Sequence, residues 1–340
     1  MASERVLVVG AGGISNAWFP PLAHEKVQVA GVVDLNLDTA RAQVAKYHLN
    51  HCLTGTQLGP MIDKTQPDFV LDLTVPEAHC QVTCAAMKAG CHVIGEKPMA
   101  PTMAQARKMV QTADETGKLY MVSQSRRWEP IHDSLTRTIA GSKIGPLTTV
   151  NCDFYIGAHF GGFRDKMPSP LILDMAIHHF DLARCVTGAN PVAVYAHEFN
   201  PANSWYDGNA SASVIFEMTN GVVFTYRASW CSEGCHTSWH GNWRFVGANG
   251  TILYENDHEP VGQVVSGKSG FFRPLKDLKM LKPAIKYTGM HGALREMLRF
   301  LRTGEKPQTE CHDNIQSLAM VCSAVESGKK AKRIEVQAGE

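Results

Sequence analysis

A glycine-rich loop directly follows a continuous apolar strand near the start of the chain. The run VLVV ends at Gly10, and Gly12, Gly13, Ile14 and Ser15 lead into a helical pattern. Glycines in such a loop allow a tight turn and let backbone N–H groups approach a diphosphate at the N-terminus of the helix. Ser15 stands where a third glycine or an alanine is usual, and it is small enough for close helix packing. The pattern predicts a dinucleotide-binding strand–loop–helix unit.

An acidic residue ends the second predicted strand. Asp34 lies 22 residues after Gly12 (34 − 12 = 22) and follows the run VQVAGVV. A carboxylate at this position accepts hydrogen bonds from the ribose hydroxyls of a dinucleotide and repels a 2′-phosphate. We therefore expect NAD as the cofactor, with NADP as the alternative.

Short apolar strands alternate with helical patterns over residues 1–124. The strand runs are VLVVG, VQVAGVVD, FVLDLTV, HVIGE and LYMVS. Because continuous apolar strands are buried on both faces, they are typical of a parallel sheet. One helical pattern begins with the capping box Thr102 to Gln105 and ends near Gly117, and another covers 81–89. The sequence predicts an α/β fold whose N-terminal domain is a Rossmann domain with a doubly wound parallel sheet.

The pattern changes after residue 125. A helical segment at 130–140 precedes the strand-like runs LTTVNCDFYI, PVAVYAHEF, ASASVIFEM, GVVFTYRASW and WRFVGANGTILYE. Turn signals at 219–221 and 248–250 suit antiparallel hairpins, and a last helix is expected at 313–326. We predict that residues 125–340 form an α/β domain on a large open, mainly antiparallel sheet. Incomplete alternation in ASASVIFEM indicates a sheet face that a partner subunit covers, so we expect a homo-oligomer, a dimer or tetramer, through this sheet.

Length and charge restrict the classes of function. A chain of 340 residues exceeds the size of about 250 to 300 residues at which one hydrophobic core stops growing. The formal net charge of +1 creates no long-range field for nucleic acid or anionic lipid, so neither is expected as a partner. The start of the chain lacks a signal-peptide pattern, and no run approaches the roughly 18 apolar residues of a membrane span. We expect a cytoplasmic protein with a small-molecule substrate.

The ten cysteines are scattered, and reduced, buried thiols are the expected state. One local cluster combines Cys231, Cys235, His236 and His240. Its spacing follows a strand pattern and lacks the paired Cys-x-x-Cys elements of a zinc site. No metal is predicted.

Four motifs resemble those of a known family. Glu96-Lys97-Pro98 follows the fourth strand run, and the segment TVPEAH at 74–79 follows the third. The segments RRWEP at 126–130 and LDMAIHHFD at 173–181 agree as well, with Ala176 where a glycine is common. Over nearly the whole length the chain resembles the Gfo/Idh/MocA family of oxidoreductases. The resemblance implies a Rossmann domain, an open-sheet α/β domain and hydride transfer between a nicotinamide cofactor and a sugar or cyclitol.

The resemblance also implies roles for individual residues. Thr74, Pro76, His79 and Glu96 are expected beside the cofactor, together with the glycine loop and Asp34. Lys97 is expected between nicotinamide and substrate, where its ammonium hydrogen-bonds the reacting oxygen and favours the alkoxide. Pro98 stiffens this turn, and the bond before it is a candidate cis peptide.

A polar stripe crosses the apolar segment at 171–181. Asp174, His178 and Asp181 are spaced i, i+4 and i+7, which places them on one face of a helix. Hydride transfer from a C–H bond requires that the attached hydroxyl lose its proton, and an imidazole accepts a proton at neutral pH. We predict His178 as the acid/base. Asp174 either orients this imidazole or binds a substrate hydroxyl directly.

Substrate contacts are predicted from residue type and position. Arg127, Tyr155, Arg164 and His240 supply donors and planar faces for a sugar ring, beside Asp174 and His178. Arg164 lies in the Gly- and Pro-containing segment HFGGFRDKMPSP, which could act as a lid. An arginine there could also select an anionic substrate such as a sugar acid.

The sequence therefore predicts an NAD(P)-dependent oxidoreductase that acts on a secondary alcohol of a sugar, glycoside or cyclitol. Three alternatives stay open. One is an NAD-using glycoside-cleaving enzyme of the same fold, which oxidises, eliminates and reduces again. Another is a ketosugar reductase that uses the same residues in reverse. The third is a non-enzymatic regulator that binds the nucleotide as a signal.

Overall fold

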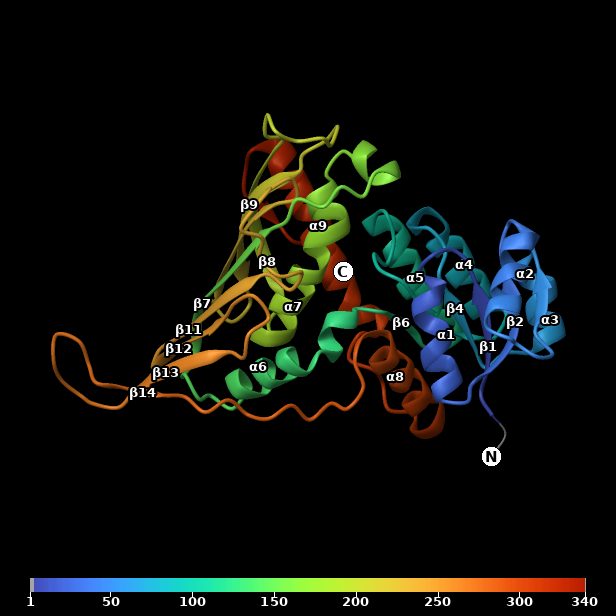
Figure 1. Ribbon diagram of the computed structural model, residues 1–340, viewed down its shortest axis with the longest axis horizontal. Coiled ribbons are helices and arrows are strands. Elements are labelled where there is room, and N and C mark those ends of the chain that lie inside the picture. The colour runs from blue at the N-terminus through green and yellow to red at the C-terminus, as the bar shows by residue number, and fades with distance from the viewer. Residues whose placement is uncertain (1–2, 340) are drawn as a thin grey trace. The chain divides into compact units, whose positions relative to one another are not determined.

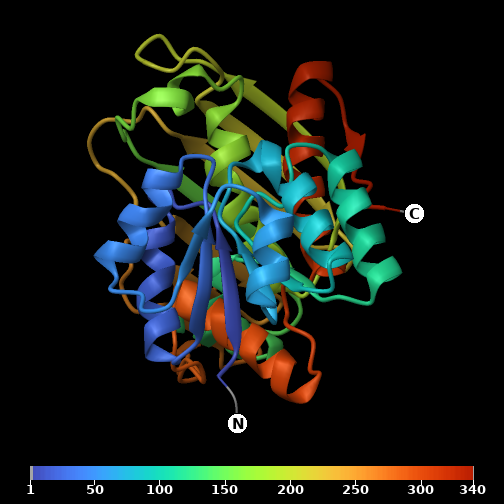
Figure 2. The same cartoon turned by 90° about the vertical axis from the view of Figure 1, so that its right-hand side faces the viewer.

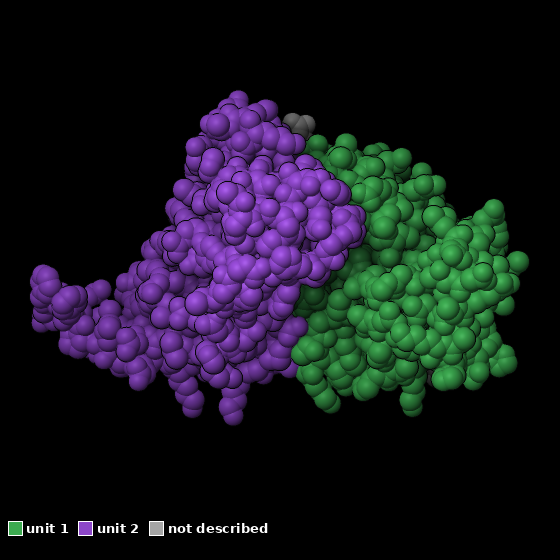
Figure 3. Space-filling model, turned by 45° about the horizontal axis from the view of Figure 1, so that its top comes forward, with its two compact units in different colours: residues 1–128, 286–318 green, residues 129–285, 319–340 purple. Residues whose placement is uncertain are grey.

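The computed structural model describes residues 3–339. The chain divides into two compact units, distinguished by colour in Figure 3. Unit 1 comprises Met1–Trp128 and Lys286–Leu318, and unit 2 comprises Glu129–Ile285 and Ala319–Glu340. The segment 286–318, which the predicted boundary after residue 124 places in the second domain, therefore packs with the N-terminal unit.

Unit 1 is built on a parallel sheet, which confirms the predicted Rossmann architecture. Within the described residues the strand order is β3-β2-β1-β4-β5-β6, and every neighbouring pair is parallel. Five of these strands match the predicted apolar runs, and the short β3 was not predicted. The strands are β1 Arg5–Val9, β2 Gln28–Val33, β3 Leu53–Gly55, β4 Phe69–Asp72, β5 His92–Gly95 and β6 Tyr120–Val122.

Helices flank this sheet, as Figure 2 shows around the blue strands. Helices α3, α4 and α5 pack side by side, and α1 packs against α8. Half of the predicted capping box forms, because the hydroxyl of Thr102 accepts the amide of Gln105, whereas Gln105 Oε1 makes no hydrogen bond within the described part of the chain. Helix α5 ends at left-handed Gly117, as predicted. The helical segments are α1 Ser15–His24, α2 Leu37–Lys46, α3 Leu58–Thr65, α4 Pro76–Lys88, α5 Met103–Thr116, the 3-10 turn η1 Ser125–Trp128 and α8 Gly289–Thr303.

Unit 2 is built on a mixed, mostly antiparallel sheet, as predicted. Its strand order in the described chain is β14-β13-β12-β11-β7-β10-β9-β8-β15 (Figure 1), with one parallel pair, β7 and β10. Both predicted hairpins form, between β9 and β10 and between β11 and β12. The strands are β7 Leu147–Tyr155, β8 Pro191–Phe199, β9 Ser211–Met218, β10 Val223–Ser229, β11 Asn242–Gly247, β12 Gly250–Tyr254, β13 Val261–Val265, β14 Leu275–Asp277 and β15 Ile334–Glu335.

The two faces of the unit 2 sheet differ in burial. Strand β9 alternates, with Val214 and Phe216 buried and Ile215 and Glu217 exposed. We call the buried side the inner face; there Phe180 of α7 packs on Phe216. The helical segments are α6 Pro130–Ala140, the 3-10 turn η2 Gly162–Lys166, the π-helix η3 Leu171–Ala176, α7 Ile177–Thr187 and α9 Cys311–Lys330, whose first residues belong to unit 1.

The last helix is longer than predicted, since α9 begins at Cys311 and ends at Lys330. In residues 3–339 no helix combines the length and apolarity that a bilayer span requires. All ten cysteines are free thiols.

A histidine in the first turn of α9 lies between two carboxylates of unit 1. His312 Nδ1 is 2.7 Å from Glu310 Oε2, and His312 Nε2 is 3.0 Å from Asp114 Oδ1 on α5. The hydrogen bond to Glu310 is the largest cause that raises the pKa of His312, and Asp114 adds to it. The imidazole therefore links α5 to the start of α9, and both carboxylates favour its charged form.

Replacing His312 with Gln should remove a pH-dependent part of the stability. A raised folded-state pKa means that this contribution is complete below the unfolded-state pKa of about 6.5 and is lost as pH rises through the folded value. Because the side chain is about half exposed, the contribution should stay below roughly 1 kcal/mol. Urea unfolding of both proteins at pH 6 and pH 9 checks this. Equal stability differences at both pH values would contradict it.

Candidate functional site

The glycine loop begins where β1 passes close to the end of β4. Gly10 has φ of +95°, and a Cβ there would lie 2.6 Å from the carbonyl oxygen of Leu73. Its amide donates to the carbonyl oxygen of Val33 at 2.8 Å. Gly10 thus meets both a backbone conformation and a space that only glycine tolerates. A Cβ on Gly12 or Gly13 would meet nothing within 4 Å, so this part of the loop is open to a ligand.

The helix after the loop presents its N-terminus to the same space. Helix α1 begins at Ser15, which is fully buried and donates its hydroxyl to the carbonyl oxygen of Gly12 at 2.7 Å. Ser15 therefore fits the close packing predicted for it. Ile14 is 39% exposed at the tip of the loop. A helix N-terminus beside open glycines suits a diphosphate.

Asp34 holds the glycine loop from the end of β2. Its Oδ2 accepts the amide of Ala11 at 2.8 Å, and its Oδ1 accepts the amide of Asn36 at 2.9 Å. The carboxylate is partly exposed. It therefore joins β2 to the loop and presents a negative charge where the sequence predicts a ribose.

A buried carboxylate shapes the turn after β4. Asp72 Oδ1 accepts the hydroxyl of Thr74 at 2.6 Å and its amide at 3.2 Å, while Oδ2 accepts the hydroxyl of Thr83 at 3.0 Å. Burial raises the pKa of Asp72. Pro76 starts α4 directly after this turn, where a missing N–H costs nothing.

His79 connects the turns that follow β4 and β5. Its Nε2 lies 3.0 Å from the carbonyl oxygen of Thr74, and its Nδ1 lies 2.9 Å from that of Pro98. The ring is 1% exposed. The Lys97-Pro98 bond, the candidate cis peptide, is cis. His79 therefore supports the turn that carries Lys97 and lies beneath its surface.

Glu96 is turned into unit 1. Its Oε1 accepts the indole N–H of Trp18 at 2.8 Å, and its Oε2 accepts the amide of Lys97 at 3.3 Å. Burial raises the pKa of Glu96. Lys97 is partly exposed next to it. Glu96 thus connects α1 to the turn, and Lys97 is the charged member of this motif that reaches the surface.

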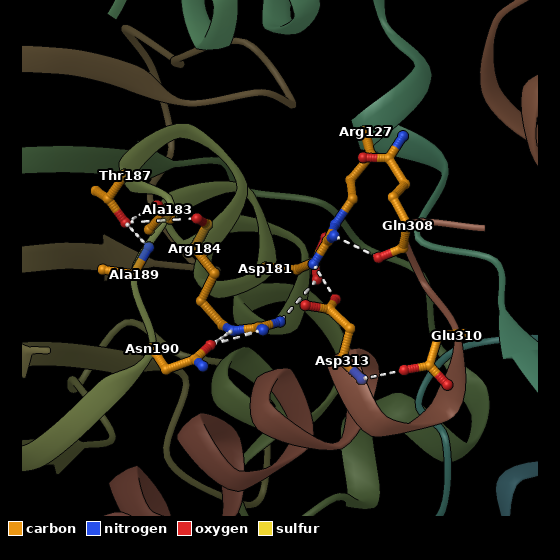
Figure 4. Close-up of polar contacts among 10 residues, drawn as sticks. All are labelled: Arg127, Asp181, Ala183, Arg184, Thr187, Ala189, Asn190, Gln308, Glu310 and Asp313. Atoms are coloured by element: carbon orange, nitrogen blue, oxygen red, sulfur yellow. Dashed lines mark hydrogen bonds and ion pairs between the residues drawn. The ribbon is translucent and has the colours of Figure 1, made fainter. Parts of the chain in front are cut away.

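Arg127 is committed to a structural role. Its side chain is buried, and it donates to the carbonyl oxygen of Gln308 at 2.9 Å and to Asp313 Oδ2 at 2.8 Å (Figure 4). Asp313 in turn donates its amide to Glu310. This network fixes the start of α9 to unit 1, so we leave Arg127 out of the proposed substrate contacts.

The side chains of the motif at 173–181 differ in burial. Asp174 in η3 and His178 at the start of α7 are partly exposed. His179 is fully buried, with Nδ1 3.2 Å from the Tyr226 hydroxyl. Asp181 is 1% exposed and lies 3.8 Å from the guanidinium of Arg184, as Figure 4 shows. The segment predicted as one helix consists of the π-helix Leu171–Ala176, which contains Asp174, followed by α7.

Arg164 meets Asp174 in unit 2. Its Nε donates to Asp174 Oδ2 at 2.6 Å. The predicted lid segment thus contacts the candidate catalytic carboxylate directly.

Tyr155 lies on the outer face of β7. Its neighbour Phe154 points to the inner face, where its ring is 4.9 Å from that of His179. Successive side chains of a strand point to opposite faces, so Tyr155 shares the outer face with Asp153 and its ion-pair partner Arg227. We therefore withdraw Tyr155 from the predicted substrate contacts of the site.

His240 belongs to a cluster of aromatic rings in unit 2. Its ring lies edge-on to buried His132 at 4.8 Å, and its carbonyl oxygen accepts the indole N–H of Trp243 at 2.7 Å. The ring is partly exposed, so a substrate contact stays a prediction.

Possible metal donors gather elsewhere in residues 3–339. The two groups are His24, Glu25 and His291, and Glu310, Cys311 and His312. Glu25 already accepts Arg295 at 2.9 Å, and a guanidinium at that distance opposes a metal cation. The cysteine and histidine cluster of the sequence analysis is not among these groups.

Several supporting residues were missed from the sequence. Trp18, Asp72 and Thr83 hold the turns of unit 1, and Asn36 positions Asp34. Asp72 carried a usable signal, because a carboxylate inside an apolar strand needs buried partners. Trp18 carried none, since its partner lies 78 residues away.

Comparison with known protein families agrees with this geometry. Residues 4–124 match the model described as "Oxidoreductase family, NAD-binding Rossmann fold", and residues 132–253 match the "GFO/IDH/MocA C-terminal domain". Together the two models span more than half of the chain. The chain belongs to the GFO/IDH/MocA family. It is an NAD(P)-dependent oxidoreductase with an NAD(P)-binding Rossmann domain.

Individual relatives are distant. The 1,5-anhydro-D-fructose reductase of Ensifer adhaerens is 24% identical over 98% of both chains. An oxidoreductase from Agrobacterium radiobacter, solved with NAD+, L-tartaric acid and magnesium, matches with a TM-score of 0.86 at 16% identity, covering 98% of this chain and 99% of that one. Levoglucosan dehydrogenase, solved with NADH and L-sorbose, matches with a TM-score of 0.83 at 18% identity, covering 99% and 100%. These structures establish the fold.

Alanine at the first two loop glycines should have different effects on stability. Gly10→Ala forces a side chain against Leu73 in a left-handed conformation and should cost about 1–3 kcal/mol of unfolding free energy. Gly12→Ala has open space and should change stability by less than about 0.5 kcal/mol. Chemical denaturation of the two variants compares them. A Gly10→Ala protein as stable as the Gly12→Ala protein would exclude the close approach described above.

Proposed function

We propose that this chain is an NAD-dependent dehydrogenase that oxidises a secondary alcohol of a sugar, glycoside or cyclitol. The division of the motif at 173–181 carries the proposal. Of its two adjacent histidines, His179 is enclosed and bound to Tyr226, whereas His178 reaches the surface together with Asp174. A proton acceptor must reach its substrate, so His178 is the acid/base and His179 belongs to the core.

The reaction balances with these groups. The substrate C–H transfers a hydride to oxidised nicotinamide, the hydroxyl transfers its proton to His178, and a ketone remains. The ammonium of Lys97 hydrogen-bonds the reacting oxygen and stabilises its developing negative charge. Asp174 accepts a hydrogen bond from a substrate hydroxyl or from the imidazole of His178.

The dinucleotide would be held at the edge of the unit 1 sheet. The open backbone of Gly12 and Gly13 and the start of α1 suit a diphosphate, and Asp34 suits the ribose hydroxyls. The bound nicotinamide supplies hydride acceptance. Thr74, Pro76, His79 and Glu96 would shape and support its pocket, as their turns join β4 and β5 to α4 and α1. We also propose a reducing, cytoplasmic location, which suits ten free thiols.

A substrate panel tests the function. Sugars, glycosides and inositols are each mixed with NAD or NADP, and the absorbance of reduced nicotinamide is followed. Formation of NADH from a ring alcohol supports a dehydrogenase. Release of the aglycone without net NADH indicates the glycoside-cleaving alternative, and NADH consumption with a ketosugar indicates a reductase. Nucleotide binding without turnover of any compound would overturn the proposal and favour a regulator.

The acid/base and lysine roles predict the effect of alanine variants. Lys97→Ala and His178→Ala should each lower turnover at least about 100-fold, since a positioned proton acceptor or charge contributes that much or more. Both variants should retain NADH binding, measured by fluorescence titration. Lys88→Ala, which removes an exposed lysine from the end of α4, serves as the control. Near-normal turnover of either test variant removes that residue from the mechanism.

We further propose that the chain forms a homo-oligomer through the outer face of the unit 2 sheet. The hairpin of β13 and β14 ends in Phe271 and Phe272, which are 97% and 85% exposed. Figure 1 shows this orange loop extending beyond the two strands. Strands β11–β14 line a hollow of about 770 Å³. A projecting aromatic pair and a hollow on the same chain suit a two-fold interface, in which the phenylalanines of each copy enter the hollow of the other.

Replacing both phenylalanines with serine should weaken this association. The two rings offer about 300–400 Å² per copy, a substantial part of a standard interface. Size-exclusion chromatography with light scattering should find an oligomer for the unaltered protein and a smaller species for Phe271→Ser/Phe272→Ser. Lys268→Ser, an exposed change in the same loop, is the control. An unaltered protein that stays monomeric at 50 µM, about the range of weak association, argues against the interface.

A further inference from the structure

The segment that carries Arg164 is fixed to a neighbouring loop of unit 2. The amide of Asp207 donates to the carbonyl oxygen of Asp165 at 2.8 Å, and the amide of Asn209 donates to that of Pro168 at 2.9 Å. Between them, a Cβ on Gly208 would overlap the carbonyl oxygen of Pro168. The loop at 207–209 therefore holds the backbone around η2 in place. This contact fixes the position of the segment that carries Arg164.

The guanidinium of Arg164 packs against two aromatic rings. It lies 5.0 Å from the ring centre of Phe160 and 4.7 Å from that of Phe163. The side chain of Arg164 is 32% exposed and that of Asp174 is 14% exposed. A guanidinium stacked on rings keeps its orientation, and partial burial strengthens its attraction to the carboxylate.

The short contact between Arg164 and Asp174 neutralises the charge of the arginine. At 2.6 Å, the bond from Arg164 Nε to Asp174 Oδ2 is a charge-assisted hydrogen bond. The pair has no net charge, so Arg164 offers little attraction to a substrate carboxylate or phosphate. Binding such an anion would require this ion pair to break, and the attraction between two partly buried charges would be lost.

We propose that Arg164 is a positioning residue that acts through Asp174 and that the substrate is neutral where it meets this pair. The guanidinium fixes the carboxylate four residues before His178, at the junction of η3 and α7. Asp174 then faces the hydroxyl of a polyol or glycoside in one orientation. The inference rests on the proposed dehydrogenase function, and it replaces the alternative in which Arg164 selects a sugar acid.

A double-mutant cycle separates this role from general support of the fold. Arg164→Gln should lower kcat about tenfold or more with the best neutral substrate, and Arg164→Lys should recover only part of the loss, because an ammonium keeps the charge but not the stacked, planar guanidinium. In an Asp174→Asn background, Arg164→Gln should change kcat less than about twofold, because the residue it acts through is already altered. An equal loss in both backgrounds would overturn the inference.

The matched control lies in the same turn. Lys166→Gln removes an exposed ion pair with Asp207 at 3.0 Å and should leave kcat and KM unchanged. Substrate charge is tested with a sugar acid and its neutral parent sugar. A selective loss of the sugar acid in Arg164→Gln, with the neutral sugar unaffected, would show that Arg164 binds the substrate anion and would overturn the inference.

A second measurement stands apart from turnover. If the unaltered protein oxidises none of the alcohols, the proposed function fails. Amide hydrogen exchange then tests the ion pair of Arg164 and Asp174 without any turnover. Amides at 160–167 should exchange faster in Arg164→Gln and Asp174→Asn to the same extent, with no further gain in the double variant. Lys166→Gln should match the unaltered protein. Unchanged exchange in Arg164→Gln would overturn the positioning role.

Discussion

The parallel pairing of β1 with β2 and with β4 brings the carboxyl ends of three strands together, and the rest of unit 1 depends on it. At that edge Gly10 donates to Val33 and lies against Leu73, while Asp34 accepts the amide of Ala11. None of these contacts is local in sequence, so each requires the register of the strands. A loop whose backbone is held from both neighbouring strands leaves its outermost amides to a ligand.

The fold was predictable where the apolar pattern was strong. Long runs such as those of β1 and β2 specify buried parallel strands, and the turn signals between β9 and β10 specify a hairpin. The short β3, and β13 and β14, were missed because strands of three to five residues, none of them buried, carry no clear period. Helix α8 was missed although its residues are amphipathic, and its packing with unit 1 depends on contacts more than 150 residues away, such as that between His291 and Glu25.

The site was predictable by residue type and less so by role. The spacing of Asp174, His178 and Asp181 predicted helical structure, which is present, but an apolar run such as LILDMA gives no sign of a π turn. The sequence could not show which face of β7 carries Tyr155, because a shift of one residue reverses every side chain. Arg127 looked available for substrate, yet its partner Asp313 is 186 residues away. Long-range polar partners decide whether an arginine serves a ligand or the fold, and periodicity contains no information about them.

His79 places both nitrogens of one ring against two separate turns. They face the backbone carbonyl oxygens of Thr74 and Pro98, and a carbonyl oxygen only accepts. Because the imidazole is planar and rigid, its width fixes the separation of these two carbonyls. A displacement of the turn that carries Lys97 would therefore also displace the turn between β4 and α4, so the two turns are mechanically coupled.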